Sequence, residues 1–246
     1  MAEVVPVSSS AQLVLLPWLL AWEQPPERTT FAAGLHAGSS LGIAVALRHD
    51  LRTLDRRTVG LLAGSCLPAA AAGALAADRV EERLGRPPQL AVLLAAAGVV
   101  LWVADRRGPT WGRTVGAREA ALAALAQVAA LAPGVSRSGA TLTALRAAGV
   151  DRAPAQRFSL LMSLPVTAGA AALTLARSDR TTLRALSPSL AVGATCAALA
   201  GAAATWTQQR RPGRSVTGPA LYRLALAALV ARRVLAERRS SRKDPS

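Results

Sequence analysis

Two polar segments interrupt an otherwise apolar chain, and the second carries groups that suit phosphate. The segment PGVSRSGATL, residues 133–142, follows Pro133-Gly134 with two serines, an arginine and a threonine. The first turn of a helix favours anions, and a guanidinium offers a planar fork of donors. A glycine at such a turn lets a ligand approach closely. We therefore expect an anion cradle at a helix N-terminus, formed by Ser136, Arg137, Ser138, Gly139 and Thr141.

The first segment, AEVVPVSSSAQL at residues 2–13, offers a different set of groups. If the chain turns before Pro6, Glu3 lies one helical turn from the serines. A carboxylate beside hydroxyls could hold a metal ion or act as a base, or one serine could be a nucleophile. The candidate residues of this segment are Glu3, Ser8, Ser9, Ser10 and Gln12.

The composition indicates that a membrane-spanning protein positions these segments. Of the 246 residues, 52% are hydrophobic and only 3% are aromatic, and the charges gather in short linkers between long apolar windows. Helices are expected because an open sheet leaves backbone groups unpaired in lipid. The six windows that we interpret as spans are residues 31–47, 59–77, 90–104, 158–176, 190–206 and 220–234.

The second polar segment lies between two apolar stretches that are too short to span a bilayer. The stretch 115–134 contains Gln127 and ends at Pro133-Gly134, and the stretch after the motif, TLTALRAAGV, is shorter still. Irregular backbone at membrane depth is tolerated where it lines a cavity or is buried in protein. The pattern therefore predicts a re-entrant hairpin that exposes its turn in a pocket.

The two polar segments also indicate an internal repeat. PVSSSAQL (6–13) resembles PGVSRSGATL, and apolar windows that begin at Phe31 and Phe158 follow after similar intervals. Each half then has a polar motif and three spans, and an odd number of spans inverts the second half. We expect an all-α integral membrane protein with two inverted-topology repeats, each a re-entrant hairpin plus three transmembrane helices, with the first hairpin truncated. We place repeat one at 1–107, repeat two at 115–236 and a basic tail at 237–246.

The chain has a formal net charge of +15. The arginines lie in loops and in the tail, where we expect them to contact anionic lipid headgroups. Nucleic acid is therefore not expected as a partner. Cys66 and Cys196 fall in apolar windows and are expected to be small buried side chains. No cysteine spacing suggests a metal site.

At these residues the chain resembles the bacterial undecaprenyl-diphosphate phosphatases of the bacitracin-resistance type. AEVVPVSSSAQL is similar to the first signature of that family, and QVAALAPGVSRSGATLTALRAAGVDRAPAQRFSLLMSLPV (127–166) is strongly similar to the second. The resemblance implies a multi-pass plasma-membrane hydrolase. It would convert undecaprenyl diphosphate to undecaprenyl phosphate and inorganic phosphate, recycle the lipid carrier of the cell wall, use Mg²⁺ or Ca²⁺, and confer bacitracin resistance.

The resemblance also implies roles for individual residues. Glu3 would be the acid, and Ser8, Ser9 and Ser10 would surround the phosphate. In the mechanism that we consider, Glu3 either coordinates the metal or positions the nucleophile, which is either Ser9 or water. Ser136 and Arg137 would be the main phosphate contacts, and Thr141 a further hydroxyl. Gln127 matches a glutamine upstream of the second signature.

Two departures from the family pattern keep an alternative open. The second acid of the family and its preceding half-helix would lie before Met1, and the family's histidine falls at Gln12. Glutamine forms hydrogen bonds but cannot take up a proton near neutral pH. His36 could substitute, although we favour a hydrogen-bonded core histidine. The alternatives are a protein that binds or moves a polyprenyl phosphate without hydrolysis and a decayed paralogue. A homo-oligomer is also left open.

Overall fold

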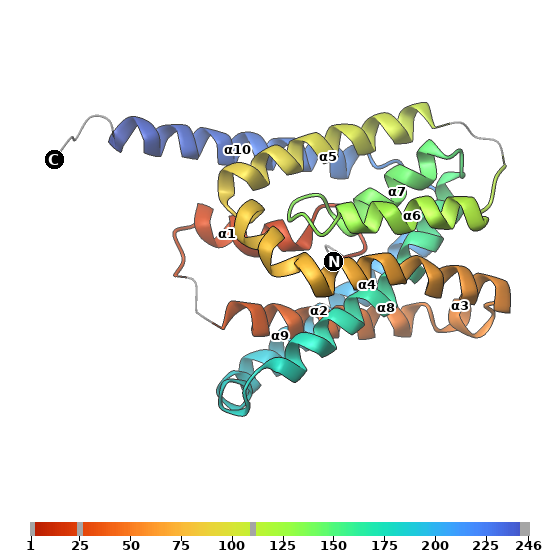
Figure 1. Ribbon diagram of the computed structural model, residues 1–246, viewed down its shortest axis with the longest axis horizontal. Helices are drawn as coiled ribbons and strands as arrows, with labels where there is room; N and C mark the ends of the chain where they lie inside the picture. The colour runs from red at the N-terminus through yellow and green to blue at the C-terminus, as the bar shows by residue number, and fades with distance from the viewer. Residues whose placement is uncertain (1–2, 24–26, 109–111, 242–246) are drawn as a thin grey trace.

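The computed structural model describes residues 3–23, 27–108 and 112–241, and its regular structure in these ranges is helical (Figure 1). The fold class predicted from the sequence, all-α, is confirmed. The helices are α1 (Ser9–Leu19), α2 (Arg28–Ala46), α3 (Arg48–Arg52), α4 (Arg56–Leu84), α5 (Pro87–Arg107), α6 (Ala117–Ala129), α7 (Arg137–Ala147), α8 (Arg152–Arg177), α9 (Arg180–Arg210) and α10 (Thr217–Ser241).

Local sequence explains where several of the long helices begin. The Asp55 side chain accepts a hydrogen bond from the backbone N–H of Thr58 at 2.9 Å and caps α4. Asp179 caps α9 in the same way, 2.8 Å from the N–H of Thr182. Helix α5 begins with prolines at its first two positions, where the missing N–H costs nothing.

Each of the six predicted spans lies largely within one helix, and four of these helices are long and apolar enough to cross a membrane. By length and composition these are α4, α5, α8 and α9, whereas α2 and α10 do not reach that hydropathy. Large apolar side chains such as Leu67, Leu75, Val192 and Leu199 are exposed on the outer surface. Such a surface suits contact with lipid tails, which are as apolar as these side chains.

The predicted hairpin of two short helices is present. Helices α6 and α7, of 13 and 11 residues, pack against each other on either side of a turn at residues 130–136 (Figure 1). A buried cluster fixes the C-terminal end of α7, where the Arg146 guanidinium donates to the Gly108 carbonyl at 2.8 Å. Asp105 pairs with Arg146 at 3.4 Å and with Arg152 at 2.8 Å.

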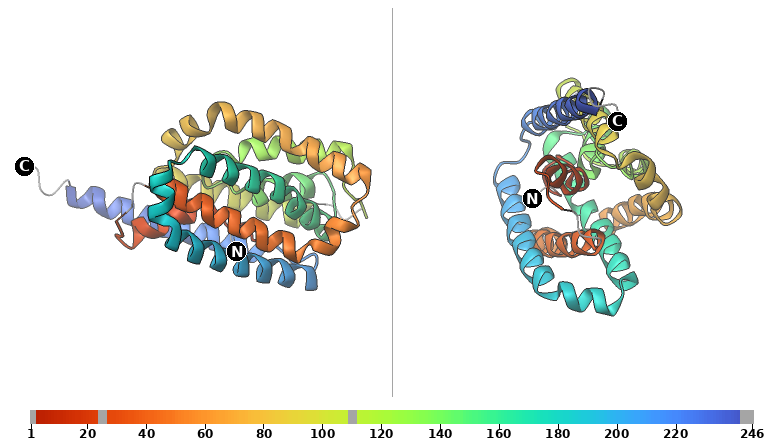
Figure 2. Two further views of the ribbon diagram at one scale, coloured as in Figure 1. Left: turned by 90° about the horizontal axis from the view of Figure 1, so that it is seen from below. Right: turned by 90° about the vertical axis from the view of Figure 1, so that its left-hand side faces the viewer.

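The remaining helices surround the N-terminal segment, as the end-on view in Figure 2 shows. Helix α2 packs most extensively against α9 and also against α8, while α4 packs against α6 and α8. Gly38 and Gly42 make the α2–α9 approach close, because a Cβ at either position would lie 2.2 Å or 2.0 Å from a carbonyl oxygen of α9. These contacts set α2, α4 and α8 around one space.

The two polar motifs have the same local geometry, although the inverted arrangement and the repeat bounds stay predictions. Ser8 and Ser136 each precede an 11-residue helix with positive φ, 68° and 70°. The hydroxyls of Ser8 and Ser10 are 3.3 Å apart, as are those of Ser136 and Ser138. At the C-terminal end, α10 continues to Ser241 and projects beyond the bundle (Figures 1 and 2).

Candidate active site

A cavity of about 690 Å³ joins the two polar motifs. Small and apolar residues of α4 and α8 form its walls, and these walls extend to Asp78 and Arg177 at the far ends of the two helices. The predicted site residues that line the cavity are Glu3, Ser8, Ser9, Ser10, Gln127, Ser136, Arg137 and Ser138. Segments more than a hundred residues apart in the sequence therefore share one site.

Glu3 and Arg137 form the central contact of the cavity. Arg137 Nη2 donates to Glu3 Oε2 at 3.0 Å, and the two side chains are 14% and 10% exposed. The other terminal nitrogen, Nη1, is buried and has no hydrogen-bond partner among the described residues. An ion pair this deeply buried satisfies its two charges, and the remaining donor of the fork is free to bind an anion.

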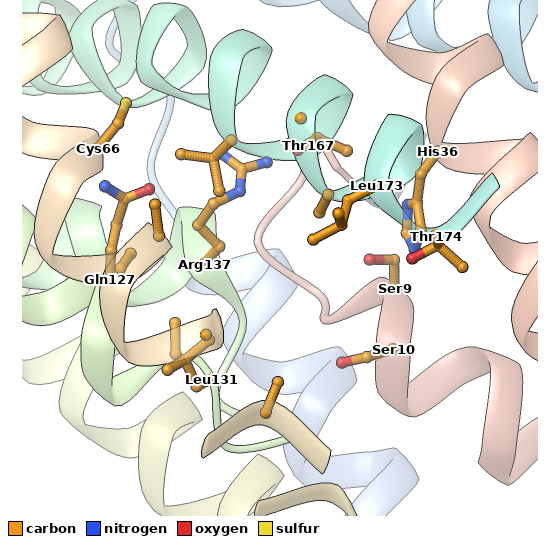
Figure 3. Close-up of a pocket in the computed structure, with 18 of the residues that line it drawn as sticks. Ser9, Ser10, His36, Cys66, Gln127, Leu131, Arg137, Thr167, Leu173 and Thr174 are labelled. Atoms are coloured by element: carbon orange, nitrogen blue, oxygen red, sulfur yellow. The ribbon is translucent and has the colours of Figure 1, made fainter. Parts of the chain in front are cut away.

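Two further donors converge on the other oxygen of Glu3. His36 Nδ1 lies 3.1 Å from Oε1, and the Ser9 hydroxyl donates to the same atom. Figure 3 shows the side chains of His36 and Ser9 close together, with Arg137 further along the cavity. The single carboxylate thus orders three side chains from three parts of the chain.

The turns before α1 and α7 hold a strained backbone conformation. Among the described residues, positive φ outside glycine occurs at Ser8, Ala21 and Ser136, and each such residue typically costs about 1–3 kcal/mol. The Ser136 hydroxyl accepts a hydrogen bond from the N–H of Gly139 at 3.2 Å, whereas the Ser8 side chain makes no such cap. Two of the three strained residues therefore lie at the cavity.

Three of the predicted substrate contacts, Gln12, Gly139 and Thr141, are not among the residues that line this cavity, and their role in binding stays a prediction. The side-chain amide oxygen of Gln12 accepts a hydrogen bond from the Tyr222 hydroxyl at 2.9 Å, and neither residue lines the cavity. Thr141 is fully buried, and its hydroxyl lies 2.6 Å from that of Ser159. A Cβ on Gly139 would lie 2.8 Å from Arg223 Nη1, so the glycine makes room for this arginine.

The cavity is also lined by residues that the sequence interpretation did not place in the site. His36 was expected in the core, but its imidazole is 28% exposed and contacts Glu3. Cys66 lines the same space, and Cys196 is exposed rather than buried. The sequence of α2 does not show which side of the helix faces the cavity, so the position of His36 in that helix could not indicate its place in the site.

The groups at Glu3 do not form a closed metal site. No cluster of three or more metal-ligating side chains of His, Cys, Asp or Glu occurs in the described residues. Both oxygens of Glu3 already have partners in Arg137, His36 and Ser9. The donor set fits a cation that arrives with phosphate oxygens among its ligands, as Mg²⁺ commonly does.

The geometry suits the transfer of a phosphoryl group from an amphipathic ester. A guanidinium, several hydroxyls and the start of α7 can stabilise charge on phosphate oxygens. The apolar walls of the same cavity, which include Pro165 of α8, can accept a hydrocarbon chain. A substrate with both features would fill both parts of the space.

Comparisons with known proteins agree with these features. The model of a family described as bacitracin resistance protein BacA matches residues 1–229. A protein named undecaprenyl-diphosphatase from Geobacter sulfurreducens is 40% identical over 218 residues, which cover 80% of each chain. Proteins of the same name from Pelobacter propionicus and Desulforudis audaxviator are 42% and 36% identical. They cover 69% and 84% of this chain and 68% and 82% of their own lengths.

Proposed function

The chain belongs to the bacitracin resistance protein BacA family, and from this premise and the cavity we propose how it acts as an undecaprenyl-diphosphatase. The enzyme hydrolyses undecaprenyl diphosphate to undecaprenyl phosphate and inorganic phosphate. Its apolar helices make it a multi-pass protein of the bacterial plasma membrane. Hydrolysis of this lipid recycles the carrier for peptidoglycan and other wall polymers, and bacitracin resistance follows from the same activity.

In the proposed mechanism, the diphosphate binds between the two serine-rich turns. Arg137 Nη1 and the first turn of α7 would contact oxygens of the terminal phosphate, with the hydroxyls of Ser136 and Ser138 beside them. These groups stabilise the negative charge on the transferred phosphoryl group and orient its phosphorus toward the nucleophile. The polyprenyl chain would lie along the small residues of α4 and α8.

On the opposite side, Glu3 would position Ser9 near the reacting phosphate. The nucleophile is either the Ser9 hydroxyl or a water molecule beside it. Attack on the terminal phosphorus breaks its bond to the bridging oxygen, and undecaprenyl phosphate leaves with the bonding electron pair. Attack by water gives inorganic phosphate directly, whereas attack by Ser9 would give a phosphoserine that water then hydrolyses to release the phosphate. The contact between Glu3 and Arg137 supports this arrangement, because it joins the two motifs at the point where charge must be stabilised.

A divalent cation is part of the proposal, with Glu3 as its protein ligand. Mg²⁺ or Ca²⁺, when bound, would supply positive charge to the phosphate oxygens. Self-association of the protein stays a prediction.

The single observation that carries the proposed site is the Glu3–Arg137 ion pair inside a cavity that has apolar walls. Binding or transport of the lipid without hydrolysis is not favoured, because the relatives named above are diphosphatases. The site also has a carboxylate, an imidazole and hydroxyls in mutual contact, which transport of a phosphate alone would not require.

The direct test is phosphate release from undecaprenyl diphosphate by the purified protein in detergent. We expect Arg137→Ala to lower the rate by about 100-fold or more, as loss of a group that stabilises developing charge typically does. Arg118→Ala, which removes a 72% exposed arginine at the start of α6, is the matched control and should keep the wild-type rate. Chelation by EDTA should stop release and Mg²⁺ should restore it.

Equal rates for Arg137→Ala and wild type would refute the mechanism. A wild-type protein that binds the lipid and releases no phosphate would instead favour the transport reading. Size-exclusion profiles of the variants separate a loss of catalysis from a loss of folding.

A further inference from the structure

A second hollow lies on the outer side of the contact between helices α4 and α6, which pack against each other (Figure 1). Its volume is about 370 Å³, and it shares no lining residue with the cavity of the candidate active site. Apart from Ser65, its lining is small or apolar and includes Gly60, Gly64 and Pro68 of α4 and Ala117, Ala121 and Leu125 of α6. We call this hollow the α4–α6 groove.

The groove is open to the surroundings of the helix bundle. A Cβ added to Gly60 or Gly64 would meet no atom within 4 Å. Leu67 and Leu125, on the same two helices, are 68% and 63% exposed, and α4 is long and apolar enough to span a membrane. In a bilayer the groove therefore faces lipid, and a narrow hydrocarbon chain can lie between the two helices.

One end of the groove carries an exposed positive charge. Arg57 lies three and seven residues before Gly60 and Gly64, which places it on the same side of α4. It is exposed, and no ion pair joins it to an acid in the described part of the chain. Asp55, the nearest acid in the sequence, already accepts a backbone N–H as the cap of α4. An anionic headgroup at the membrane surface would supply the complementary charge.

The inner side of the same helix contact leads to the active site. Ser65 lines the groove, and its hydroxyl lies 3.2 Å from the carbonyl oxygen of Ala120 on α6. The Ser65 carbonyl accepts from Gln127 Nε2 at 2.8 Å, and Gln127 lines the cavity. An occupant of the groove would therefore pack against the contact that positions Gln127.

We propose that the α4–α6 groove binds an anionic phospholipid, a function separate from hydrolysis. One acyl chain lies against Gly60 and Gly64, and the headgroup phosphate lies at Arg57 near the membrane surface. Basic pockets between membrane helices bind acidic lipids in this way. A second copy of the chain fits less well, because a symmetric dimer through the groove would bring the arginines at the start of α4 in both copies together.

The test measures thermal unfolding of the purified protein in detergent with one of two added lipids. Dioleoylphosphatidylglycerol is anionic, whereas dioleoylphosphatidylcholine has the same acyl chains and no net charge. A ligand that binds only the folded protein stabilises it. At a concentration of about 100 times Kd, phosphatidylglycerol should raise the melting temperature of the wild type by about 5–10 °C. Phosphatidylcholine should raise it by less.

Two variants remove the two parts of the site, each with a matched control. Arg57→Gln removes the charge, and Arg79→Gln changes an exposed arginine near the other end of α4. Gly64→Leu fills the groove, and Gly218→Leu adds the same side chain on α10, where no atom lies within 4 Å. We expect Arg57→Gln to need about fivefold more phosphatidylglycerol for the same shift. Gly64→Leu should lose the shift, and both controls should respond like the wild type.

Equal responses of the wild type, Arg57→Gln and Gly64→Leu to phosphatidylglycerol would overturn the proposal, as would equal shifts with the two lipids. A wild-type dimer in light scattering that Gly64→Leu converts to a monomer would show that a second copy occupies the groove, which also overturns it. The measurement needs no turnover, so Arg137→Ala should respond like the wild type. A protein that binds phosphatidylglycerol in the groove but releases no phosphate would refute the proposed function and leave this inference intact.

Discussion

At the scale of residues, the amide of Gln127 has only one orientation available. Gln127 is 2% exposed, and its Nε2 donates to the Ser65 carbonyl at 2.8 Å. A carbonyl can only accept, so the amide oxygen must face the other way. This oxygen is buried without a partner among the described residues, and the residue lines the cavity. A protonated phosphate oxygen or a water molecule would satisfy it.

We expect Gln127→Glu to weaken substrate binding. A carboxylate at this position loses the donor to Ser65 and places negative charge in the cavity that receives the diphosphate. The KM for undecaprenyl diphosphate should rise about tenfold or more, which corresponds to about 1.4 kcal/mol. Gln208→Glu on α9, outside the cavity lining, makes the same chemical change as a control. A KM equal to that of the control would show that Gln127 does not face the phosphate.

At the scale of elements, α10 holds the turn between α6 and α7 through Arg223. This side chain is fully buried, and Nη2 donates to the carbonyls of Gly134 and Val135, each at 2.7 Å. A buried arginine without an acidic partner is costly, so the carbonyl contacts must compensate. We call these two hydrogen bonds the Arg223 clamp. The nearer of its two carbonyls belongs to Val135, two residues before Arg137, so the clamp helps to set the position of the Arg137 guanidinium.

Arg223→Lys should lower the stability of the hairpin and the activity together. Lysine has a single ammonium group in place of the planar fork, so it cannot reproduce the same contacts. We expect a loss of about 2–3 kcal/mol in the free energy of unfolding, typical of a lost hydrogen bond to a charged group. Thermal unfolding in detergent measures it, with Arg232→Lys on the exposed side of α10 as the control. An unchanged melting temperature would rule out the clamp.

At the scale of the whole molecule, the packing of α2 against α9 decides where His36 lies. The two helices approach so closely that a Cβ on Gly38 would be 2.2 Å from the Ala194 carbonyl oxygen. Thr30 and Ser178, whose hydroxyls are 2.9 Å apart, fix the start of α2 against the end of α8. Together these contacts hold His36 opposite the N-terminal segment, beside Glu3.

Gly38→Ala should therefore destabilise the bundle and displace the imidazole. The added methyl group would clash with the backbone of α9, and overpacking of this kind lowers the free energy of unfolding by about 1–3 kcal/mol. Gly64→Ala on α4 adds the same methyl group where nothing lies within 4 Å, and it should be neutral or slightly stabilising. A lower melting temperature for Gly38→Ala alone is the expected result. Equal melting temperatures would show that α2 and α9 can separate without cost.

The sequence by itself determined the local features of this protein. Long apolar windows, in which backbone groups must pair internally, indicated the helices. The proline–glycine break before Ser136 indicated a hairpin, and the structure has both the short helices and the turn. Phosphate binding at this turn stays a prediction. These features depend on residues that are neighbours in the chain, so their pattern can be read directly.

Only the tertiary structure decided which side chains share the cavity. An α-helix has 3.6 residues per turn. A small rotation of the helix about its axis therefore replaces a side chain that faces the cavity with one that is buried or faces outward. Packing therefore excluded Gln12 and Thr141 and included His36. The Glu3–Arg137 contact spans 134 residues, and no local pattern fixes a distance of that kind. The long-range packing of α2, α4 and α8 around the N-terminal segment sets it.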